Sequence, residues 1–490
     1  MTKYTSFFLI YMIKLTSGSD NMQLPSFKDA RKRNKEKVEK EYYELNSNLT
    51  NLGLNKTYYI KTYGCQMNEH DTENLKAMLE QLGFTEDDNM DEADVVILNT
   101  CSIRENAHNK AFGMLGRLKH VKEELNKDLI IGLCGCMAQE ETVVSDIMKK
   151  YKYVNFVFGT HNIHHLPYIL EQAMRTKKQV IEVLSKEGDI VEGVPAKRAN
   201  RYKAFVNIMY GCDKFCTYCI VPYTRGKQRS RDKDNILKEV KKLVKDGYKE
   251  VTLLGQNVNA YGKDLDSNYD MANLLEDVAK TGIPRVRFMT SHPWDFTDDM
   301  IDVIKKYKNI MPSIHLPVQS GSNKVLRLMG RKYTKEEYIE LFDKLKTIPN
   351  VTISTDIIVG FPSEEEEDFE ETIKLCKYCK FDNAYTFIFS PREGTAALNL
   401  EDKATDEEKE HRLYELNELV NKYFLESNKK MIGKTVEVLV DGPSEKEGML
   451  CGYTDTNKLI NFVGDESLIG EIVKVEVTDA KTWSLDGKQK

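Results

Sequence analysis

Three strand-like segments in the first third of the chain each lead into a cysteine. The segments are 58–62, 94–98 and 129–133 (YYIKT, DVVIL and LIIGL). The cysteines that follow them are Cys65, Cys101 and Cys136, and helical stretches separate the segments. Because parallel strands joined by helices end at one edge of their sheet, the pattern predicts an α/β domain whose three cysteines converge. Three small residues buried at strand ends are the plainer alternative.

A second group of three cysteines lies on one short loop. Cys212, Cys216 and Cys219 have the spacing C-x3-C-x2-C directly after an apolar strand at 204–210. Thiolates are soft ligands that suit iron–sulfur clusters, and three of them leave one iron of a four-iron cube open to an outside ligand. A zinc site is the rival interpretation. Zinc sites use two spaced pairs of cysteines or add histidine, however, and no histidine lies near this loop.

The same strand begins a second series of alternating strands and helices. Six strands are predicted, at 204–210, 250–254, 286–289, 313–316, 352–359 and 384–389. This alternation predicts a partial (β/α)6 barrel, with its ligands at the carboxyl ends of the strands. A charged helix is expected at 401–430. Four short strands then predict a small all-β barrel, at 433–441, 448–453, 458–463 and 471–478.

The length of 490 residues allows about three domains. We divide the chain into an amino-terminal extension (1–57), a parallel-sheet α/β domain (58–170), a linker (171–197), the barrel domain (198–430) and the terminal module (431–490). In the extension, mixed charges at 31–44 predict a solvated helix.

The composition is that of a globular protein in a reducing compartment. Hydrophobic residues make up 41% of the chain and charged residues 30%, which excludes a disordered or collagenous protein. No apolar run reaches about 18 residues, so no membrane-spanning helix is predicted. The apolar stretch 6–13 is short and no small-residue cleavage pattern follows it. We therefore expect a cytoplasmic protein whose thiols stay reduced.

The net charge of −6 hides a basic segment beside the cysteine loop. Residues 197–231 contain nine Lys or Arg residues and one acid. This local charge predicts contacts with RNA phosphates. We assign RNA binding to four of these cations, Arg225, Lys227, Arg229 and Arg231. The terminal module has seven basic and eleven acidic residues, a balance that does not favour phosphate binding.

The cysteine loop resembles that of the radical S-adenosylmethionine (SAM) superfamily. The loop follows the first strand of the predicted barrel, and Tyr218 occupies the aromatic position before the last cysteine. The resemblance implies that Cys212, Cys216 and Cys219 hold a 4Fe-4S cluster exchangeable with SAM. It also implies that one-electron reduction cleaves SAM to a radical, a chemistry that belongs to the cofactor and that the protein positions.

Three further motifs resemble those of the methylthiotransferase domain. They are 63–68 (YGCQMN), 99–106 (NTCSIREN) and 135–139 (GCMAQ). In that family their cysteines, here Cys65, Cys101 and Cys136, hold an auxiliary 4Fe-4S cluster. The last motif selects Cys136 over the neighbouring Cys134. The resemblance also implies a flavodoxin-like sheet for this domain and a TRAM barrel, a small RNA-binding fold, for the terminal module.

The SAM ligands are expected where the barrel strands end. The candidates are Tyr218, Gln256, Asn257, Gln319, Ser320, Asp356 and Gly360. The last two belong to a stretch, 356–361, that resembles the glycine-containing SAM motif of the superfamily. Each of these residues also has a plainer interpretation as a polar or turn residue of a loop.

The amino-acid sequences of three stretches indicate the substrate. The stretches 101–106, 222–231 and 254–262 resemble the MiaB-type enzymes, which convert N6-isopentenyladenosine at tRNA position 37 to its 2-methylthio form. The resemblance implies two 4Fe-4S clusters, one SAM as methyl donor and another as radical source. The expected partners are the tRNA anticodon loop and an electron donor such as flavodoxin or ferredoxin. The sulfur source stays open, and a monomer is expected.

Two alternatives remain. Sister methylthiotransferases act on threonylcarbamoyl-adenosine in tRNA or on ribosomal protein S12. A non-catalytic iron–sulfur protein that binds RNA would explain the clusters and the basic segment, but not an open iron at a barrel mouth. The pair Cys376 and Cys379 could be half a zinc site, although a packed helix is favoured because no second pair follows.

Overall fold

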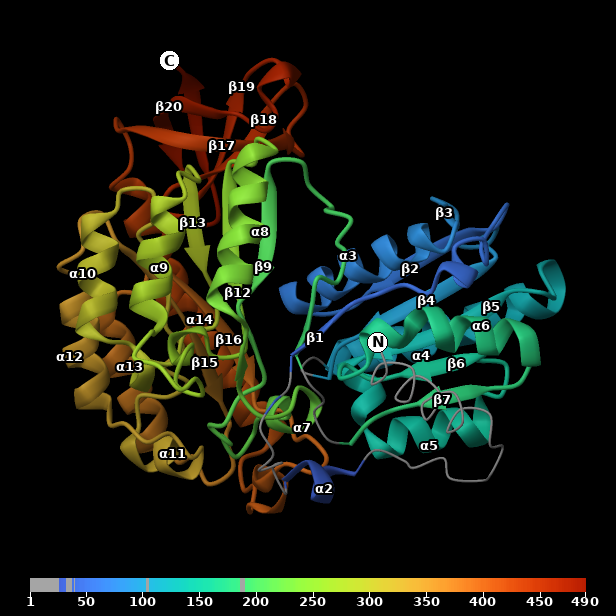
Figure 1. Ribbon diagram of the computed structural model, residues 1–490. Coiled ribbons are helices and arrows are strands. Elements are labelled where there is room, and N and C mark those ends of the chain that lie inside the picture. Colours follow the sequence, from blue (N-terminus) through green and yellow to red (C-terminus); the bar gives the residue numbers. More distant parts are fainter. Residues whose placement is uncertain (1–25, 32–37, 39, 103–104, 186–189) are drawn as a thin grey trace.

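The computed structural model describes residues 26–31, 38, 40–102, 105–185 and 190–490. Figure 1 shows a sheet domain on the right, a barrel on the left and a small β barrel at the top. The apolar stretch 6–13 and the motif residues Ile103 and Arg104 lie outside the described residues. No helix among the described residues is long and apolar enough to cross a membrane.

The amino-terminal sheet has six parallel strands in the order β3-β2-β4-β5-β6-β7. The strands are β2 (Thr57–Thr62), β3 (Thr85–Glu86), β4 (Val95–Thr100), β5 (Ile130–Gly135), β6 (Phe156–Phe158) and β7 (Val180–Glu182). This is the flavodoxin-like order with one strand added at its end, so the expected sheet is confirmed. Every residue of β4 is buried, which explains the continuous apolar run in the sequence.

Helices cover both faces of this sheet (Figure 1). One apolar cluster joins the sheet to α3 (Gln66–Gln81) and α6 (Leu166–Thr176), and a second joins it to α4 (Glu105–His120) and α5 (Glu141–Lys150). Burial of two faces by helices is the arrangement that an all-parallel sheet requires. The carboxyl edge of the sheet is left for other contacts.

The boundaries around this domain differ from the expectations. The strand β7 adds to the sheet within the segment 171–197, where a linker was expected. In the extension, β1 (Lys40–Tyr42) pairs in parallel with β8 (Ile190–Glu192), so the expected helix at 31–44 is wrong at this strand. Backbone pairing with a distant segment outweighs the helical propensity of the local sequence here.

The central domain is a partial barrel of two three-stranded parallel sheets. One contains β9 (Lys203–Asn207), β12 (Glu250–Leu254) and β13 (Arg285–Phe288), and the other β14 (Ser313–His315), β15 (Thr352–Val359) and β16 (Asn383–Ile388). The six strands predicted from the sequence are confirmed. Among the described strands, β9 and β16 do not pair, so the barrel stays open between them.

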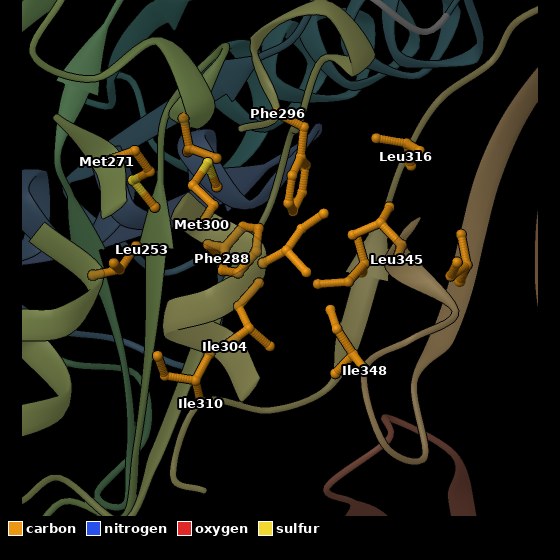
Figure 2. Packing of buried hydrophobic residues seen from close by; sticks show 14 of the residues in the cluster. Leu253, Met271, Phe288, Phe296, Met300, Ile304, Ile310, Leu316, Leu345 and Ile348 are labelled. Carbon is orange, nitrogen blue, oxygen red and sulfur yellow. The ribbon is translucent and has the colours of Figure 1, made fainter. Parts of the chain in front are cut away.

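Helices enclose this barrel and share one large apolar core with it. They are α8 (Lys233–Lys245), α9 (Met271–Lys280), α10 (Asp298–Lys306), α12 (Lys335–Leu345), α13 (Glu366–Cys379) and α14 (Asp406–Lys429). In Figure 2, Leu253 of β12 and Phe288 of β13 pack near Met300 of α10. Cys376 and Cys379 are buried in the same core, as expected for a packed helix.

The terminal module is a closed five-stranded barrel, as expected. The strands are β17 (Thr435–Pro443), β18 (Leu450–Thr454), β19 (Leu459–Val463), β20 (Ile472–Ala480) and β21 (Leu485–Gln489). The sequence predicted four of them and missed β21, a polar segment (LDGKQ) whose strand conformation depends on pairing with β19 and β20.

This module sits at the end of the central barrel where the strands begin. Lys203, at the start of β9, pairs with Asp441 at 2.7 Å. Arg285, at the start of β13, donates hydrogen bonds to two main-chain carbonyls of the module, each at 2.9 Å. The module therefore lies at the opposite end from the carboxyl ends of the barrel strands (Figure 1).

The last residue of β5 has to be glycine. Gly135 has a φ of +94°, and a Cβ there would lie 2.3 Å from the carbonyl oxygen of Thr100. We expect Gly135→Ala to lower the free energy of unfolding by about 2–5 kcal/mol, from the left-handed backbone and the clash together. Urea unfolding of the metal-free protein measures this change.

Gly116→Ala is the matched control for that substitution. Gly116 is an exposed residue inside α4 with no atom within 4 Å of its Cβ position, so alanine should stabilise the helix by about 0.5–1 kcal/mol. Equal stability of the two variants would contradict the assignment of strain to the end of β5.

Candidate metal and cofactor site

The three amino-terminal cysteines meet at the carboxyl edge of their sheet. Cys65 is the N-cap residue of α3, Cys101 follows β4, and Cys136 begins the short helix η3 (Cys136–Gln139). The side chains of Cys65 and Cys101 are hydrogen-bonded to each other, and Cys136 lies close enough to interact electrostatically with Cys65. β2 and β4 flank the point where the strand order reverses, which is where ligands bind in such sheets.

An amide network fixes the ends of these strands. Asn68 Nδ2 donates to Asn99 Oδ1 at 3.1 Å and to the carbonyl of Thr100 at 3.0 Å. In return, Asn99 Nδ2 donates to the carbonyl of Asn68 at 2.8 Å and to Thr72 Oγ1 at 3.0 Å. All four residues are buried, so the network holds α3 against β4 in one register. The motifs contain these asparagines, but sequence reasoning gave a role only to the cysteines.

The charge on the amino-terminal thiols is set by their surroundings. The hydrogen bond with Cys101 and the nearby Arg225 guanidinium lower the pKa of Cys65 to about 6, although burial opposes them. Burial raises the pKa of Cys136, and Arg225 partly opposes that effect. Cys134 points into the apolar core between the sheet and its helices, where burial raises the pKa of its thiol. Cys136 thus lies beside Cys65, whereas Cys134 lies in the core, which agrees with the choice of Cys136 made from the motif.

One arginine from the barrel domain enters this site. Arg225 Nε donates to Cys136 Sγ at 3.2 Å, and its Nη2 donates to Asp71 Oδ2 of α3 at 2.6 Å. Next to it, Thr160 Oγ1 donates to the carbonyl of Thr224 at 2.5 Å. These contacts bring the segment after the second cysteine loop against the first group of cysteines.

The second cysteine loop is held at both of its ends. β10 (Met209–Tyr210) pairs antiparallel with β11 (Arg229–Ser230), and this pairing joins the two ends of the loop between them. Within it, the amide of Cys212 donates to the carbonyl of Gly226 at 3.1 Å. Gly211 has a φ of +73°, and a Cβ there would lie 2.0 Å from the carbonyl oxygen of Lys227. The loop therefore needs glycine at its entrance.

The three cysteines of this loop form a compact group. The amide of Cys219 donates to the carbonyl of Cys216 at 2.9 Å, and the three side chains interact electrostatically. Burial raises the pKa of Cys212 to about 11 and that of Cys219 to about 12. Without a bound cation the thiols of Cys212 and Cys219 stay protonated at neutral pH, so a metal that binds them must displace their protons.

A lysine of this loop is anchored by a buried acid that sequence reasoning missed. Asp295 accepts from Lys214 at 2.7 Å, from Lys263 at 2.6 Å and from Asn257 Nδ2 at 2.7 Å. These three donors lower the pKa of Asp295 although burial opposes them. The carboxylate therefore holds the loop against the ends of β12 and β13. The partners lie far apart in the sequence, so no motif could have revealed them.

The residues expected to bind SAM lie near the barrel mouth, on the cysteine loop or on the segments after β12, β14 and β15, except that Asp356 lies within β15. Gln256 Oε1 accepts from the amide of Gly211 at 2.5 Å, which ties β12 to the cysteine loop. Tyr218 is partly buried, and its hydroxyl accepts from Arg331 Nη2 at 3.0 Å. Ser320 is buried and within 3.3 Å of Thr372 Oγ1.

The remaining candidates surround β15. Gln319 has a φ of +73°, and its amide donates to the carbonyl of Asp356 at 2.9 Å. Asp356 Oδ2 lies 3.4 Å from His315 Nε2. Gly360 has a φ of +66°, and its amide donates to Glu364 Oε1 at 2.8 Å.

Two buried polar atoms at this mouth indicate a polar ligand. Within the described part of the chain, Asn257 Oδ1 and Ser291 Oγ have no hydrogen-bond partner. These residues follow β12 and β13, two strands whose ends border the cysteine loop. Because buried polar groups are normally paired, the two atoms fit the polar atoms of a bound cofactor.

The structure does not support the expected phosphate contacts of the arginines in the basic segment. Arg225, Arg229 and Arg231 are buried. Arg231 pairs with Glu192 at 2.8 Å and with Glu239 at 3.0 Å, so its charge is compensated inside the protein. Of the four cations assigned to RNA, only Lys227 is partly exposed. A count of local charge could not distinguish cations on the surface from cations that join domains.

Comparison with known proteins agrees with this architecture. Residues 206–376 match the model of the Radical SAM superfamily, residues 57–159 that of the Uncharacterized protein family UPF0004, and residues 429–490 that of the TRAM domain. A relative from Bacillus cytotoxicus, named tRNA-2-methylthio-N(6)-dimethylallyladenosine synthase, is 57% identical over 470 residues, which cover 95% of this chain and 92% of that protein. A relative of the same name from Bacillus cereus is also 57% identical over the same shares.

The chain belongs to the family of tRNA-2-methylthio-N(6)-dimethylallyladenosine synthases.

Solved structures show the fold. A structure of the radical SAM methyltransferase TsrM from Kitasatospora setae, with cobalamin and a [4Fe-4S] cluster bound, has a TM-score of 0.51 at 12% identity and covers 70% of this chain and 74% of that one. A second structure of TsrM, with tryptophan and a SAM analogue bound, has a TM-score of 0.50 at 12% identity, covering 68% and 72%. At this identity the likeness concerns the fold alone.

A member of the radical SAM superfamily uses a 4Fe-4S cluster and SAM, and the residues present here fit both. Each group offers three thiols and no imidazole, a donor set that suits iron–sulfur clusters better than zinc. Among the described residues, no three His, Cys, Asp or Glu side chains surround a single ion position. A four-iron cube takes one thiolate per iron, so its ligands spread around the cube.

The two neighbouring cysteines of β5 and η3 should respond differently to substitution. We expect Cys136→Ala to remove about four iron atoms per chain from the reconstituted protein, because it removes a thiol of the site. Cys134→Ala should keep the iron of the wild type and lower the free energy of unfolding by ~1–3 kcal/mol, because its thiol fills the core. Iron analysis and urea unfolding of both variants measure these effects. Loss of iron in Cys134→Ala alone would contradict the assignment.

Proposed function

We propose that this chain is a tRNA methylthiotransferase that converts N6-isopentenyladenosine at tRNA position 37 to 2-methylthio-N6-isopentenyladenosine. The observation that carries the proposal is the 57% identity, over 95% of the chain, to relatives named for this activity. The geometry supports it, because two groups of three cysteines lie at two sheet edges that the Arg225 segment joins.

Each group of cysteines has a separate role in the proposal. Cys212, Cys216 and Cys219 hold the cluster that binds SAM, and the other three cysteines hold a second 4Fe-4S cluster. When bound, these groups supply a radical, a sulfur atom and a methyl group. The radical removes hydrogen from C2 of the adenine, and the methyl group comes from a second SAM. A carbon that carries no activating group requires this radical chemistry, which explains why one chain would need both sites.

The side chains of the chain position these groups. Asp295 holds Lys214 and thereby fixes the cysteine loop, and Gln256 holds the entrance of the same loop. The unpaired atoms of Asn257 and Ser291, as described above, are placed to bind polar atoms of SAM. Cys101 and Cys136 are buried, and the other four cysteines are partly buried, which limits the access of water to a reactive radical.

The substrate base must reach the cysteine groups at the two sheet edges. An anticodon-loop base that is splayed out of its stack can enter such a site, as bases do in other enzymes that modify them. Near the cysteine loop, Trp294 is 46% exposed, with Lys214 and Lys332 each positioned over its ring at 5.1 and 5.3 Å. An exposed ring with flanking cations suits base stacking and phosphate contact better than the buried arginines do.

The remaining partners follow from the chemistry. The SAM cluster needs a one-electron donor, for which a flavodoxin or ferredoxin is suited. The reaction also consumes sulfur, whose source the proposal leaves open. The protein acts as a monomer in the cytoplasm, where tRNA is found and thiols stay reduced.

Other substrates and a non-catalytic role are the competing functions. Anaerobic enzyme with SAM and reductant distinguishes them when it is offered isopentenylated tRNA, threonylcarbamoylated tRNA and ribosomal protein S12. The 2-methylthio nucleoside from the first substrate alone supports the proposal. Product from either of the others assigns a sister activity, and no 5′-deoxyadenosine with any of them indicates a non-catalytic protein.

Substitutions should separate the two cysteine groups in this assay. We expect Cys212→Ala to abolish 5′-deoxyadenosine formation, because the SAM cluster loses a ligand. Cys65→Ala should retain measurable 5′-deoxyadenosine and lose the methylthio product, because only the second cluster is damaged. Quantification of both products by mass spectrometry tests this, with Cys451→Ala as a control in the terminal module. Equal loss of both products in both variants would contradict the division of roles.

A further inference from the structure

The guanidinium of Arg225 is buried between two domains. The residue follows α7 (Val221–Thr224), shortly after Cys219 in the barrel domain, and is 5% exposed. It donates from Nε to Cys136 Sγ and from Nη2 to Asp71, at 3.2 and 2.6 Å. A positive charge from one domain thus lies directly against a thiol of the other domain.

Comparison with a second buried arginine shows what is unusual about this contact. Arg231 lies in the same segment and is also buried, but it binds the carboxylates of both Glu192 and Glu239. Among the described residues, Arg225 forms an ion pair with the single carboxylate of Asp71 and directs a further N–H to sulfur. Its charge is therefore shared with the cysteine site, whereas the charge of Arg231 is compensated by acids.

We propose that Arg225 is a positioning residue that holds Cys136 and raises the reduction potential of the cluster at Cys65, Cys101 and Cys136. The inference rests on the proposed function, since it assumes a cluster at these cysteines. Hydrogen bonds to ligand sulfur withdraw electron density from an iron–sulfur cluster, and a nearby positive charge stabilises the more negative, reduced form. In a buried site this charge is poorly screened.

Asp71 also influences the reduction potential of this cluster, through Arg225. Its carboxylate fixes one edge of the guanidinium, so that Nε points to Cys136, and it also neutralises part of the positive charge. Removal of the arginine and removal of its acidic partner should therefore move the potential in opposite directions. If Arg225 and Asp71 only held the two domains together, the two substitutions would not shift the potential in opposite directions.

The test uses the full chain with Cys212, Cys216 and Cys219 changed to Ala, so that only the amino-terminal cluster is titrated. Anaerobic redox titration, followed by electron paramagnetic resonance, compares this protein with versions carrying Arg225→Gln or Arg225→Lys. We expect the glutamine variant to keep about four iron atoms and to shift to a more negative potential. The lysine variant, which keeps the charge, should shift less. Equal potentials at equal iron content would overturn the inference.

Asp71→Asn keeps the inference testable if Arg225→Gln loses its iron. This variant retains the guanidinium and is nearly isosteric, and we expect a less negative potential than that of the parent. No shift, or a shift to a more negative potential, would overturn the inference. The titration needs no tRNA, so its outcome is separate from the proposed function. Wild-type protein that makes no methylthio product would refute that function and leave the potentials as measured.

Discussion

Parallel strands leave their carboxyl ends at one edge of a sheet, and the functional arrangement of this protein depends on that constraint. In the amino-terminal sheet it gathers three cysteines that are spread from position 65 to position 136. In the central barrel it gathers the cysteine loop, the ends of β12 and β13, and Gln319. Arg225 then joins the two edges through its contacts with Asp71 and Cys136. Two sites that are separate in the sequence become neighbours in this way.

The elements with the strongest sequence signals were predicted well. β12 and β15 have the predicted bounds: β12 is buried along its whole length, and β15 alternates between buried and partly buried residues, a clear strand pattern. β21 was missed because the sequence LDGKQ has no apolar pattern of its own and becomes a strand by pairing with its neighbours. β1 was assigned to a helix for the same reason, since its partner β8 lies about 150 residues away in the chain. Local patterns predict elements that bury their own side chains.

The cysteines of the site were recognisable from their spacing, whereas their supporting residues were not. Lys214 and Asp295 are 81 positions apart and become partners only when β13 is placed beside the loop. The basic segment shows the reverse case: Arg225 and Arg231 were assigned to phosphates and are instead buried against Asp71, Glu192 and Glu239. Net charge along the sequence does not report which charges the fold compensates internally.

The most direct test of the account is the magnetic interaction between the two clusters. Electron paramagnetic resonance of the fully reduced wild type is compared with spectra of two variants, one lacking Cys65, Cys101 and Cys136 and one lacking Cys212, Cys216 and Cys219. If the two sites adjoin, the wild-type spectrum shows spin–spin broadening or splitting that the sum of the two variant spectra lacks. A wild-type spectrum equal to that sum, with both clusters fully loaded, would contradict the account.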